Sequence, residues 1–418
     1  MTPQTPTAIL RWGNASVRIG MVLDVYKPHV SGVTNYVSIN KQALERAGHE
    51  VFVFAFGTKD SRTDEKNVVL SPGLPLARTS YAFGFTFTRA ARRLLQSMDV
   101  VHVHHPFLSG RLALRYCRAA GIPIVFTNHT RYDLYAQVYL PLLPDQLGQA
   151  FLQAYMPAFC RDVNLVIAPS QGLCNVLREM GVEAPIEVIP NGVDLAPFRA
   201  GPRPIERSRL GVPQDDVLII FVGRLGLEKN LAFLLRAFIA LHRAQPQVSL
   251  LLVGEGPDRD DLRDRARAEG AGEKVFFTGL VPYPDVPRYL AASDLFATAS
   301  RTEVHPLSVI EALAAGLPVV GIDSPGVSDT IVDGQTGFVA ENTVEALTSK
   351  LELLVRDKAL RRRMAEAASR SAEAYDVDRT SALVAARYRD LVANAKPPRR
   401  RPWDHLLDRL LDRPSETA

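Results

Sequence analysis

Two glutamates eight positions apart, Glu303 and Glu311, have the spacing that points most directly to chemistry. Pro306 lies between them and is predicted to be the first residue of a helix, where its missing N–H costs no hydrogen bond. Glu303 is then expected on the loop that enters the helix, and Glu311 in its second turn. Such carboxylates can bind sugar and ribose hydroxyls, and the helix N-terminus suits an anion. The alternative is a solvated loop glutamate and an exposed helical one.

A second predicted turn carries two cations. Residues 217–222 are strongly apolar and predict a buried strand, and Arg224 and Lys229 follow in the turn before the next predicted helix. Cations in such a turn can hold a phosphate, although the spacing is neither the dinucleotide fingerprint nor the P-loop. They would also offset the charge of Glu303 and Glu311 beside a diphosphate, if both turns share one edge of a sheet. A solvated basic loop is the alternative.

Four further residues fall at or just beyond the carboxyl ends of predicted strands: Gly32, His104, His129 and Val281. Glycine in such a turn lets the backbone approach a ligand, but simple turn geometry would also explain it. Two histidines on the same edge could reach one ligand, with His129 the stronger candidate, although a single histidine is more often structural. The backbone at Val281 could meet a nucleotide base.

Short apolar segments alternate with helical segments along the chain, which predicts an α/β protein with parallel sheets covered on both faces. In such sheets, ligands bind beyond the carboxyl ends of the strands. The length of 418 residues favours two or three domains, and the Pro- and Arg-rich residues 199–213 indicate a boundary. The predicted strands are residues 18–25, 51–56, 100–104, 122–127, 165–168, 217–222, 249–253, 275–281 and 292–297.

The composition is ordinary for a globular protein, with 47% hydrophobic and 22% charged residues. A net charge of +4 is modest at this length and does not indicate nucleic acid as a partner. The three cysteines lack metal-ligand spacing and are expected to be buried thiols in a reducing compartment. We find neither a secretory signal in Met1 to Val17 nor an apolar run near the ~18 residues that span a bilayer. The expected location is cytoplasmic, in solution or peripherally on the inner face of the cell membrane.

Three segments could contact a membrane or a lipid. Residues 85–98 predict a helix that carries Arg89, Arg92 and Arg93. Residues 132–160 are rich in Tyr, Leu and Phe, which suits either ordinary core or an apolar channel for an amphiphilic acceptor. The tail, residues 396–418, combines a basic cluster with a Leu-rich amphipathic piece, which suits an anionic membrane surface. A disordered, solvated tail is an equal alternative.

Taken together, the chain resembles the retaining glycosyltransferases of family four. The resemblance covers Arg18 to about Ala393. Its motifs are Gly32, the Ile-Pro-Asn-Gly-Val-Asp of residues 189–194, residues 221–224 with Lys229-Asn230, and residues 303–312 followed by 316–320. It implies the GT-B architecture, two Rossmann-like domains with parallel sheets facing across a cleft. The implied domains are 1–198 on the acceptor side, joined by the C-terminal helix 376–395, and 199–375 for the sugar nucleotide.

The resemblance also implies a reaction: transfer of a hexose from a sugar nucleotide, with retained anomeric configuration and with no metal or cofactor. UDP-hexose is the expected donor and GDP-hexose the alternative. Arg224 and Lys229 would hold the diphosphate with the backbone N–H of Gly32, Glu311 the ribose and Glu303 the donor sugar, while His129 would lie beside the sugar and the acceptor. The implied catalytic residues are His129, Glu303, Arg224 and Lys229. The implied substrate-binding residues also include Gly32, Val281, His305, Leu307, Ser308 and Glu311.

One departure bears on the donor sugar. Many members of the family have an aromatic residue and a glycine two residues after the first glutamate, whereas this chain has His305 and Pro306. Because Pro306 cannot donate a backbone N–H, we expect the donor hexose to be held differently.

The segment from His129 to Tyr135, with the apolar stretch after it, resembles bacterial diacylglycerol glycosyltransferases of this family. This implies a lipid acceptor and glycolipid synthesis at the cytoplasmic face of a membrane, with an anionic membrane surface as a further partner. The alternatives are a soluble or polyprenyl-linked glycan acceptor in polysaccharide synthesis, a sugar-nucleotide epimerase, and a non-catalytic sugar-nucleotide binder. The intact set of Arg224, Lys229, Glu303 and Glu311 argues against the last of these.

Overall fold

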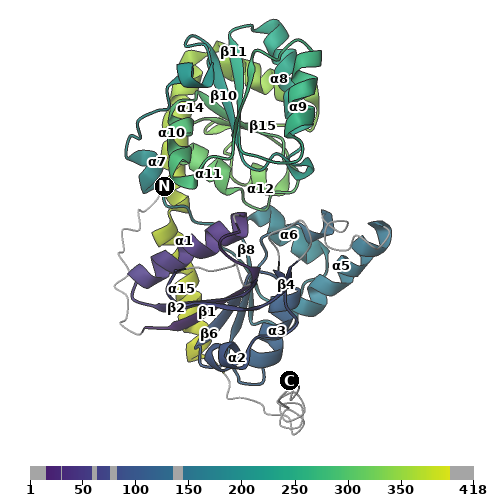
Figure 1. The fold of residues 1–418 in the computed structure, drawn as a ribbon, viewed down its shortest axis with the longest axis vertical. Coiled ribbons are helices and arrows are strands. Elements are labelled where there is room, and N and C mark those ends of the chain that lie inside the picture. Colours follow the sequence, from purple (N-terminus) through teal and green to yellow (C-terminus); the bar gives the residue numbers. More distant parts are fainter. Residues whose placement is uncertain (1–15, 30, 59–63, 76–81, 135–144, 396–418) are drawn as a thin grey trace, which may run out of the picture.

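The computed structural model describes residues 16–29, 31–58, 64–75, 82–134 and 145–395. Two lobes follow one another along the chain, and each contains a parallel sheet with helices packed against it (Figure 1). The α/β class and the two Rossmann-like units are therefore confirmed. The predictions made for the tail and for residues 135–144 of the apolar stretch lie outside the described residues.

The N-terminal lobe contains a seven-stranded sheet in the order β3-β2-β1-β6-β7-β8-β9, and all of its pairings are parallel. A separate antiparallel pair joins β4 to β5. The strands are β1 (Arg18–Val25), β2 (Glu50–Gly57), β3 (Val68–Pro72), β4 (Leu74–Pro75), β5 (Ala82–Phe83), β6 (Val100–Val103), β7 (Ile124–Thr127), β8 (Leu165–Ala168) and β9 (Ile186–Val188). Strands β6, β7 and β8 are buried throughout, which explains their unbroken apolar character.

The helices of the N-terminal lobe are α1 (Gly32–Arg46), α2 (Arg89–Leu95), α3 (Leu108–Cys117), η1 (Tyr132–Leu134), α5 (Asp145–Cys160) and α6 (Gln171–Glu179), and the short α7 (Ala196–Arg199) follows. Helix α2 is shorter than the predicted 85–98. It begins at Arg89 because the hydroxyl of Thr88 caps it, accepting the N–H of Ala91 at 3.2 Å. Arg92 is turned toward the protein and lies 5.0 Å from the ring centre of Tyr116.

The C-terminal lobe contains a six-stranded parallel sheet in the order β12-β11-β10-β13-β14-β15. Its strands are β10 (Val217–Val222), β11 (Val248–Val253), β12 (Val275–Gly279), β13 (Leu295–Thr298), β14 (Val319–Ile322) and β15 (Gly337–Ala340). The strand predicted over 275–281 ends at Gly279, whose φ of 72° lies in the left-handed region. The order places β10 and β13 side by side at the middle of the sheet.

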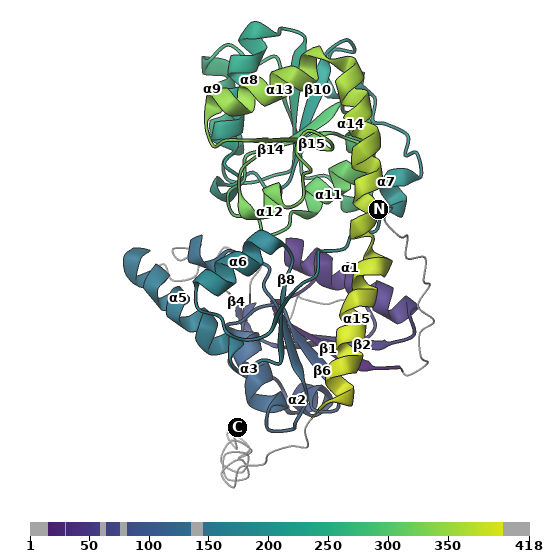
Figure 2. The same ribbon diagram turned by 180° about the vertical axis from the view of Figure 1, so that it is seen from behind.

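Helices cover both faces of this second sheet (Figures 1 and 2). The helical segments are η2 (Arg207–Leu210), η3 (Leu227–Lys229), α8 (Leu231–Ala244), α9 (Arg259–Ala268), η4 (Tyr283–Asp285), α10 (Val286–Ala291), α11 (Leu307–Ala314), α12 (Pro325–Ser328), α13 (Val344–Arg356), α14 (Lys358–Ser371), η5 (Ala372–Tyr375) and α15 (Val377–Ala393). No helix in the described ranges is long and apolar enough to cross a membrane.

The last helix, α15, runs back along the N-terminal lobe (Figure 2). It packs against α1 and β6, and the hydroxyl of Tyr388 lies 2.6 Å from Nδ1 of His102. Just before α15, Asp376 forms a parallel bridge with Val193. The chain therefore passes between the lobes twice at neighbouring places, once at each end of the C-terminal lobe.

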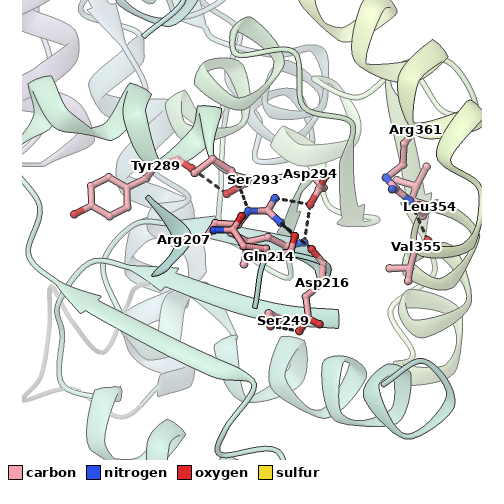
Figure 3. A network of polar contacts seen from close by, with 12 residues as sticks. Arg207, Gln214, Asp216, Ser249, Tyr289, Ser293, Asp294, Leu354, Val355 and Arg361 are labelled. Atoms are coloured by element: carbon pink, nitrogen blue, oxygen red, sulfur yellow. Dashed lines mark hydrogen bonds and ion pairs between the residues drawn. The ribbon is translucent and has the colours of Figure 1, made fainter. Parts of the chain in front are cut away.

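Arg207 lies on η2, within residues 199–213 between the two lobes, and forms hydrogen bonds with groups at the amino end of the second sheet (Figure 3). Its guanidinium donates to the carbonyls of Ala292 and Asp216, both at 2.9 Å, and to the Asp294 carboxylate at 2.8 Å. The buried Asp216 carboxylate in turn accepts from Ser249 at 2.6 Å. This network lies at the end of the sheet opposite to the strand ends where ligands are expected.

Candidate active site

The turn after β10 and the loop after β13 are tied together, as expected for neighbouring strands. The hydroxyls of Ser300 and Thr302 donate to the carbonyl of Glu228 at 3.0 and 3.2 Å. On the other side, the N–H of Gly326 donates to the carbonyl of Glu303 at 3.2 Å. A Cβ at Gly326 would lie 2.5 Å from that oxygen, so only glycine lets α12 pack here. The loop that carries Glu303 is thus held from both sides.

Glu303 and Lys229 are in direct contact, because Lys229 Nζ donates to Glu303 Oε1. The side chain of Lys229 is only 24% exposed and that of Glu303 19%, so water screens the pair weakly. Arg224 lies on the same turn, with its guanidinium 3.6 Å from Glu228 and 67% exposed. Two cations, Arg224 and Lys229, and two carboxylates, Glu228 and Glu303, therefore lie at one edge of the sheet. The cations can bind a phosphate while the carboxylate of Glu303 accepts hydrogen bonds from hydroxyls.

Helix α11 begins one residue later than predicted. Pro306, with φ −72° and ψ 118°, occupies the N-cap position, and its carbonyl accepts from the N–H of Val309 at 3.1 Å. The backbone N–H groups of Leu307 and Ser308 have no acceptor among the residues that the structure describes. Free N–H groups and the positive end of the helix dipole make this end of α11 suitable for an anion.

Glu311 is a buried carboxylate, 5% exposed, which rules out the exposed helical position considered above. Tyr283 donates its hydroxyl to Glu311 Oε1 at 2.9 Å, and no ion pair with Glu311 occurs within the described ranges. Burial raises the pKa of Glu311 to about 7, although the hydrogen bond from Tyr283 acts in the opposite direction. A buried carboxylate without a cation is costly to the fold, and such groups are typical of ligand sites.

Gly32 is the first residue of α1, and the Ser31 side chain accepts the N–H of Thr34 at this helix end. A Cβ at Gly32 would meet no atom within 4 Å, and its φ is outside the left-handed region. The glycine of the turn after β11 differs, because a Cβ at Gly254 would lie 1.9 Å from a backbone oxygen. No contact or strain among the described residues therefore requires glycine at position 32, which leaves open surface beside a helix N-terminus.

The turn before α1 is influenced by one cation of the other lobe, Arg224. Burial lowers the pKa of His29, and the charges of His105 and Arg224 lower it further. His29 precedes α1 in the N-terminal lobe, whereas Arg224 follows β10 in the C-terminal lobe. His29, three residues before Gly32, thus lies within electrostatic range of Arg224 in the other lobe.

The two histidines predicted at one edge are hydrogen-bonded to each other, with His104 Nδ1 3.0 Å from His129 Nε2. Burial lowers the pKa of both well below the usual range, so both rings are neutral at neutral pH. His104 is fully buried, which fits the structural interpretation, while His129 retains exposed surface and packs its ring 4.6 Å from that of Tyr36. His129 can therefore donate or accept a hydrogen bond, but carries no charge.

His305 is buried between the lobes. Its Nδ1 accepts the N–H of Asn191 at 3.3 Å, its carbonyl accepts Asn191 Nδ2 at 2.9 Å, and its ring packs 5.1 Å from that of Tyr375. His305 thus links the loop of Glu303 to Asn191, near the end of the N-terminal lobe. The contact of His305 with substrate stays a prediction. Val281 is partly exposed just beyond β12, as the base contact requires.

Two residues of this region were missed by sequence reasoning. Tyr283 follows Val281 by two positions, so the strand end pointed to it, but only the fold shows that it reaches Glu311. His29 lies in the predicted turn, without a pattern that singles it out. In the described part of the chain, no group of three or more His, Cys, Asp or Glu residues could hold a metal ion.

The parallel two-lobe fold and the charged turns after β10 and β13 are those expected of a glycosyltransferase, and comparison with known families shows that class. The description "Glycosyltransferase Family 4" matches residues 30–197, and "Glycosyl transferases group 1" matches residues 202–371. The chain therefore belongs to glycosyltransferase family four, with the GT-B fold.

Among its relatives is the alpha-monoglucosyldiacylglycerol synthase of Streptococcus pneumoniae, 30% identical over 349 residues, which cover 81% of this chain and 78% of the relative. Similar solved structures include sucrose-phosphate synthase from Thermosynechococcus elongatus, with a TM-score of 0.73 and 20% identity over 90% of this chain and 99% of that one. Anabaena Alr3699/HepE in complex with UDP-glucose has a TM-score of 0.69 and 20% identity over 90% and 100% of the two chains.

Proposed function

We propose that this glycosyltransferase transfers a hexose from a nucleoside diphosphate sugar to a membrane lipid such as diacylglycerol, with retention of the anomeric configuration. The observation that carries the proposal is the contact of Lys229 with Glu303 beside the free N–H groups of α11. Cation, carboxylate and helix end match the diphosphate and the sugar of such a donor. UDP-hexose is the proposed donor, and GDP-hexose is the alternative.

In the proposed reaction the leaving diphosphate gains negative charge as its bond to the sugar breaks. Arg224, Lys229 and the N–H groups at the start of α11 stabilise this charge, so no metal ion is needed for that purpose. The acceptor hydroxyl attacks from the same face and gives its proton to the leaving phosphate oxygen. Glu303 and His129 position the sugar and the acceptor, and much of the rate enhancement comes from that positioning. A neutral His129 suits this role, because the step requires no cationic histidine.

A lipid acceptor fits the surface of the N-terminal lobe. A cavity of about 310 Å³ is lined by apolar side chains and one cation: Phe85, Phe107, Leu108, Leu112, Tyr155 and Arg111, with Gly84. Phe107 and Leu108 precede and begin α3, directly after the strand end that bears His104. The cavity therefore lies next to the proposed acceptor side of the site. The name of the Streptococcus pneumoniae relative also supports a diacylglycerol-type acceptor.

Charge on the same lobe supports peripheral binding to an anionic membrane on its cytoplasmic side. Residues 84–161 contain eight arginines, three aspartates and neither lysine nor glutamate. Arg89 and Arg93 on α2, with Arg111 and Arg115 on α3, are exposed. Basic side chains near an apolar cavity favour attachment to anionic lipids.

The test is transfer of radiolabelled hexose to lipid. The full chain is incubated with UDP- or GDP-hexose, with vesicles that contain diacylglycerol and an anionic phospholipid, and with a soluble glycan as competing acceptor. We expect label in the lipid extract with one nucleotide, and product with the anomeric configuration of the donor. Label only in a water-soluble glycan would assign a soluble acceptor, whereas turnover to a sugar isomer without acceptor would indicate an epimerase. Either result would contradict the lipid proposal.

A further inference from the structure

Tyr283 lies between two parts of the proposed donor site. It begins η4, just beyond the carboxyl end of β12 where the base is expected, and the residue is 37% exposed. Its hydroxyl reaches Oε1 of Glu311, the residue proposed to bind the ribose, at 2.9 Å. The hydrogen bond of Tyr283 is made to Oε1, and none is made to Oε2 by the described residues.

We propose that Tyr283 is a positioning residue for the nucleotide, acting through Glu311: its hydroxyl fixes Oε1 so that Oε2 stays open to the ribose hydroxyls. This inference rests on the proposed function, because it takes a sugar nucleotide as the ligand of Glu311. It adds a residue and a role that the sequence motifs do not contain.

The physical argument starts from the burial of Glu311. An ionised carboxylate accepts hydrogen bonds at both oxygens and can therefore hold both hydroxyls of a ribose, whereas a protonated one loses part of that capacity. Desolvation favours the protonated form, and a hydrogen bond donated by Tyr283 favours the ionised form. Tyr283 thus keeps the carboxylate both oriented and charged in the state that a ribose requires.

Other charged groups surround α11 without contacting Glu311. The elements packed against α11 are α7, α14, η5 and β14, and His305 precedes the helix. Burial and the Glu311 carboxylate raise the pKa of Tyr283, and Asp194 raises it further. The titratable groups on these elements and on η4 are Arg199, Lys358, Arg361, Arg362, Arg363, Glu366, Arg370, Glu373, Tyr375 and Asp285. None of them forms a hydrogen bond or ion pair with Glu311, which leaves Tyr283 as the hydrogen-bond donor.

The experiment measures the affinity for UDP-hexose by calorimetry, without acceptor, between about pH 6 and pH 8.5. Both phosphates of this probe are esterified, so the ligand does not titrate in that range. In the wild type, we expect affinity to rise with pH as Glu311 ionises. In Tyr283→Phe, we expect about tenfold weaker binding at pH 7, recovering toward the wild-type value at the alkaline end, because alkali restores the carboxylate. Tyr289→Phe, on the neighbouring α10, is the matched control and should follow the wild type.

Four outcomes would contradict the inference or the proposed function. A profile of Tyr283→Phe that superimposes on the wild type would overturn the inference. A loss that is uniform across pH would overturn the claim that Tyr283 keeps Glu311 ionised, because the orienting contact alone has no pH dependence. Glu311→Gln should bind weakly at every pH and show no rise, and a retained rise would assign the titration to another group. If the wild type binds neither UDP- nor GDP-hexose, the proposed function itself fails, which distinguishes the two claims.

Discussion

Glu311 lowers the free energy of unfolding at neutral pH, and it is also the residue proposed to bind the ribose. Its carboxylate is buried with a single neutral donor, so the folded protein stabilises the protonated form and raises the pKa to about 7 from 4.5. Between these values the folded state holds more protons than the unfolded state, so the free energy of unfolding decreases as pH rises. The contribution is fully present below about pH 4.5 and is lost by about pH 7. A residue that destabilises the fold at neutral pH is expected to serve a ligand.

Glu311→Gln should therefore stabilise the protein and weaken donor binding. At about pH 8 we expect the variant to gain up to about 3 kcal/mol in unfolding free energy, because Gln keeps the acceptor for Tyr283 without the buried charge. Near pH 4 the gain should vanish. Urea unfolding at both values measures this, and UDP-hexose titration measures the loss of binding. A variant that is less stable than the wild type at pH 8 would contradict the burial argument.

At Gly32, unlike Glu311, we expect a substitution to affect binding without changing the stability of the fold. Replacement by leucine adds a side chain where no atom lies within 4 Å of the new Cβ. We expect Gly32→Leu to leave unfolding free energy within about 0.5 kcal/mol, and to raise the KM for the donor at least tenfold by occupying its space. Melting curves and donor kinetics check the two halves separately. An unchanged KM would remove Gly32 from the proposed site.

At the scale of elements, the segment between the two lobes, residues 199–213, is stabilised far from the chemistry. The Arg207 guanidinium, on η2, bonds to groups at the starts of β10 and β13, the strands whose other ends carry the site (Figure 3). Its side chain is 17% exposed, so its partners would remain partly desolvated if it were removed.

Arg207→Ala should lower the unfolding free energy by about 1–3 kcal/mol, since the carbonyls of Ala292 and Asp216 lose their donor. The matched control is Arg203→Ala, because the Arg203 side chain is 85% exposed and should change stability by less than about 0.5 kcal/mol. Denaturant titrations of both variants test the difference. Equal effects would mean that the network contributes nothing measurable.

Many of these elements could be predicted from the sequence, because buried parallel strands show as apolar runs. The first residues of the helices could be predicted less accurately. Helix α2 begins four residues after the predicted start because Thr88 caps it, and Pro306 is the cap of α11 instead of its first residue. The sequence suggested that the turns of Lys229 and Glu303 share one edge, although it did not predict their direct contact. The Tyr283–Glu311 bond joins residues 28 positions apart on different elements, and no sequence pattern indicates it.

At the scale of the whole molecule, direct contacts connect the lobes on the side away from α15. The Asp329 carboxylate, at the end of α12, accepts the N–H of Gly172 in the first turn of α6 at 2.6 Å. A Cβ at Gly172 would lie 2.8 Å from that carboxylate, so the approach depends on glycine. An acid at a helix N-terminus is also favoured by the helix dipole.

Removing this contact should loosen the arrangement of the two lobes. For Asp329→Ala without ligand, we expect small-angle X-ray scattering to give a larger radius of gyration than for the wild type. Asp215→Ala, an exposed aspartate elsewhere in the same lobe, is the control and should match the wild type. Identical scattering for all three proteins would show that the Asp329 contact does not hold the lobes together.

The central claim is that the turn after β10 and the loop after β13, in the C-terminal lobe, hold the diphosphate of a sugar nucleotide. The most direct test is calorimetric titration of UDP-hexose and GDP-hexose into the wild type and into Lys229→Ala, with circular dichroism to verify that both are folded. We predict that the wild type binds one of the two nucleotides and that Lys229→Ala binds it at least tenfold more weakly. Equal affinity in a folded variant, or no binding by the wild type, would contradict the account.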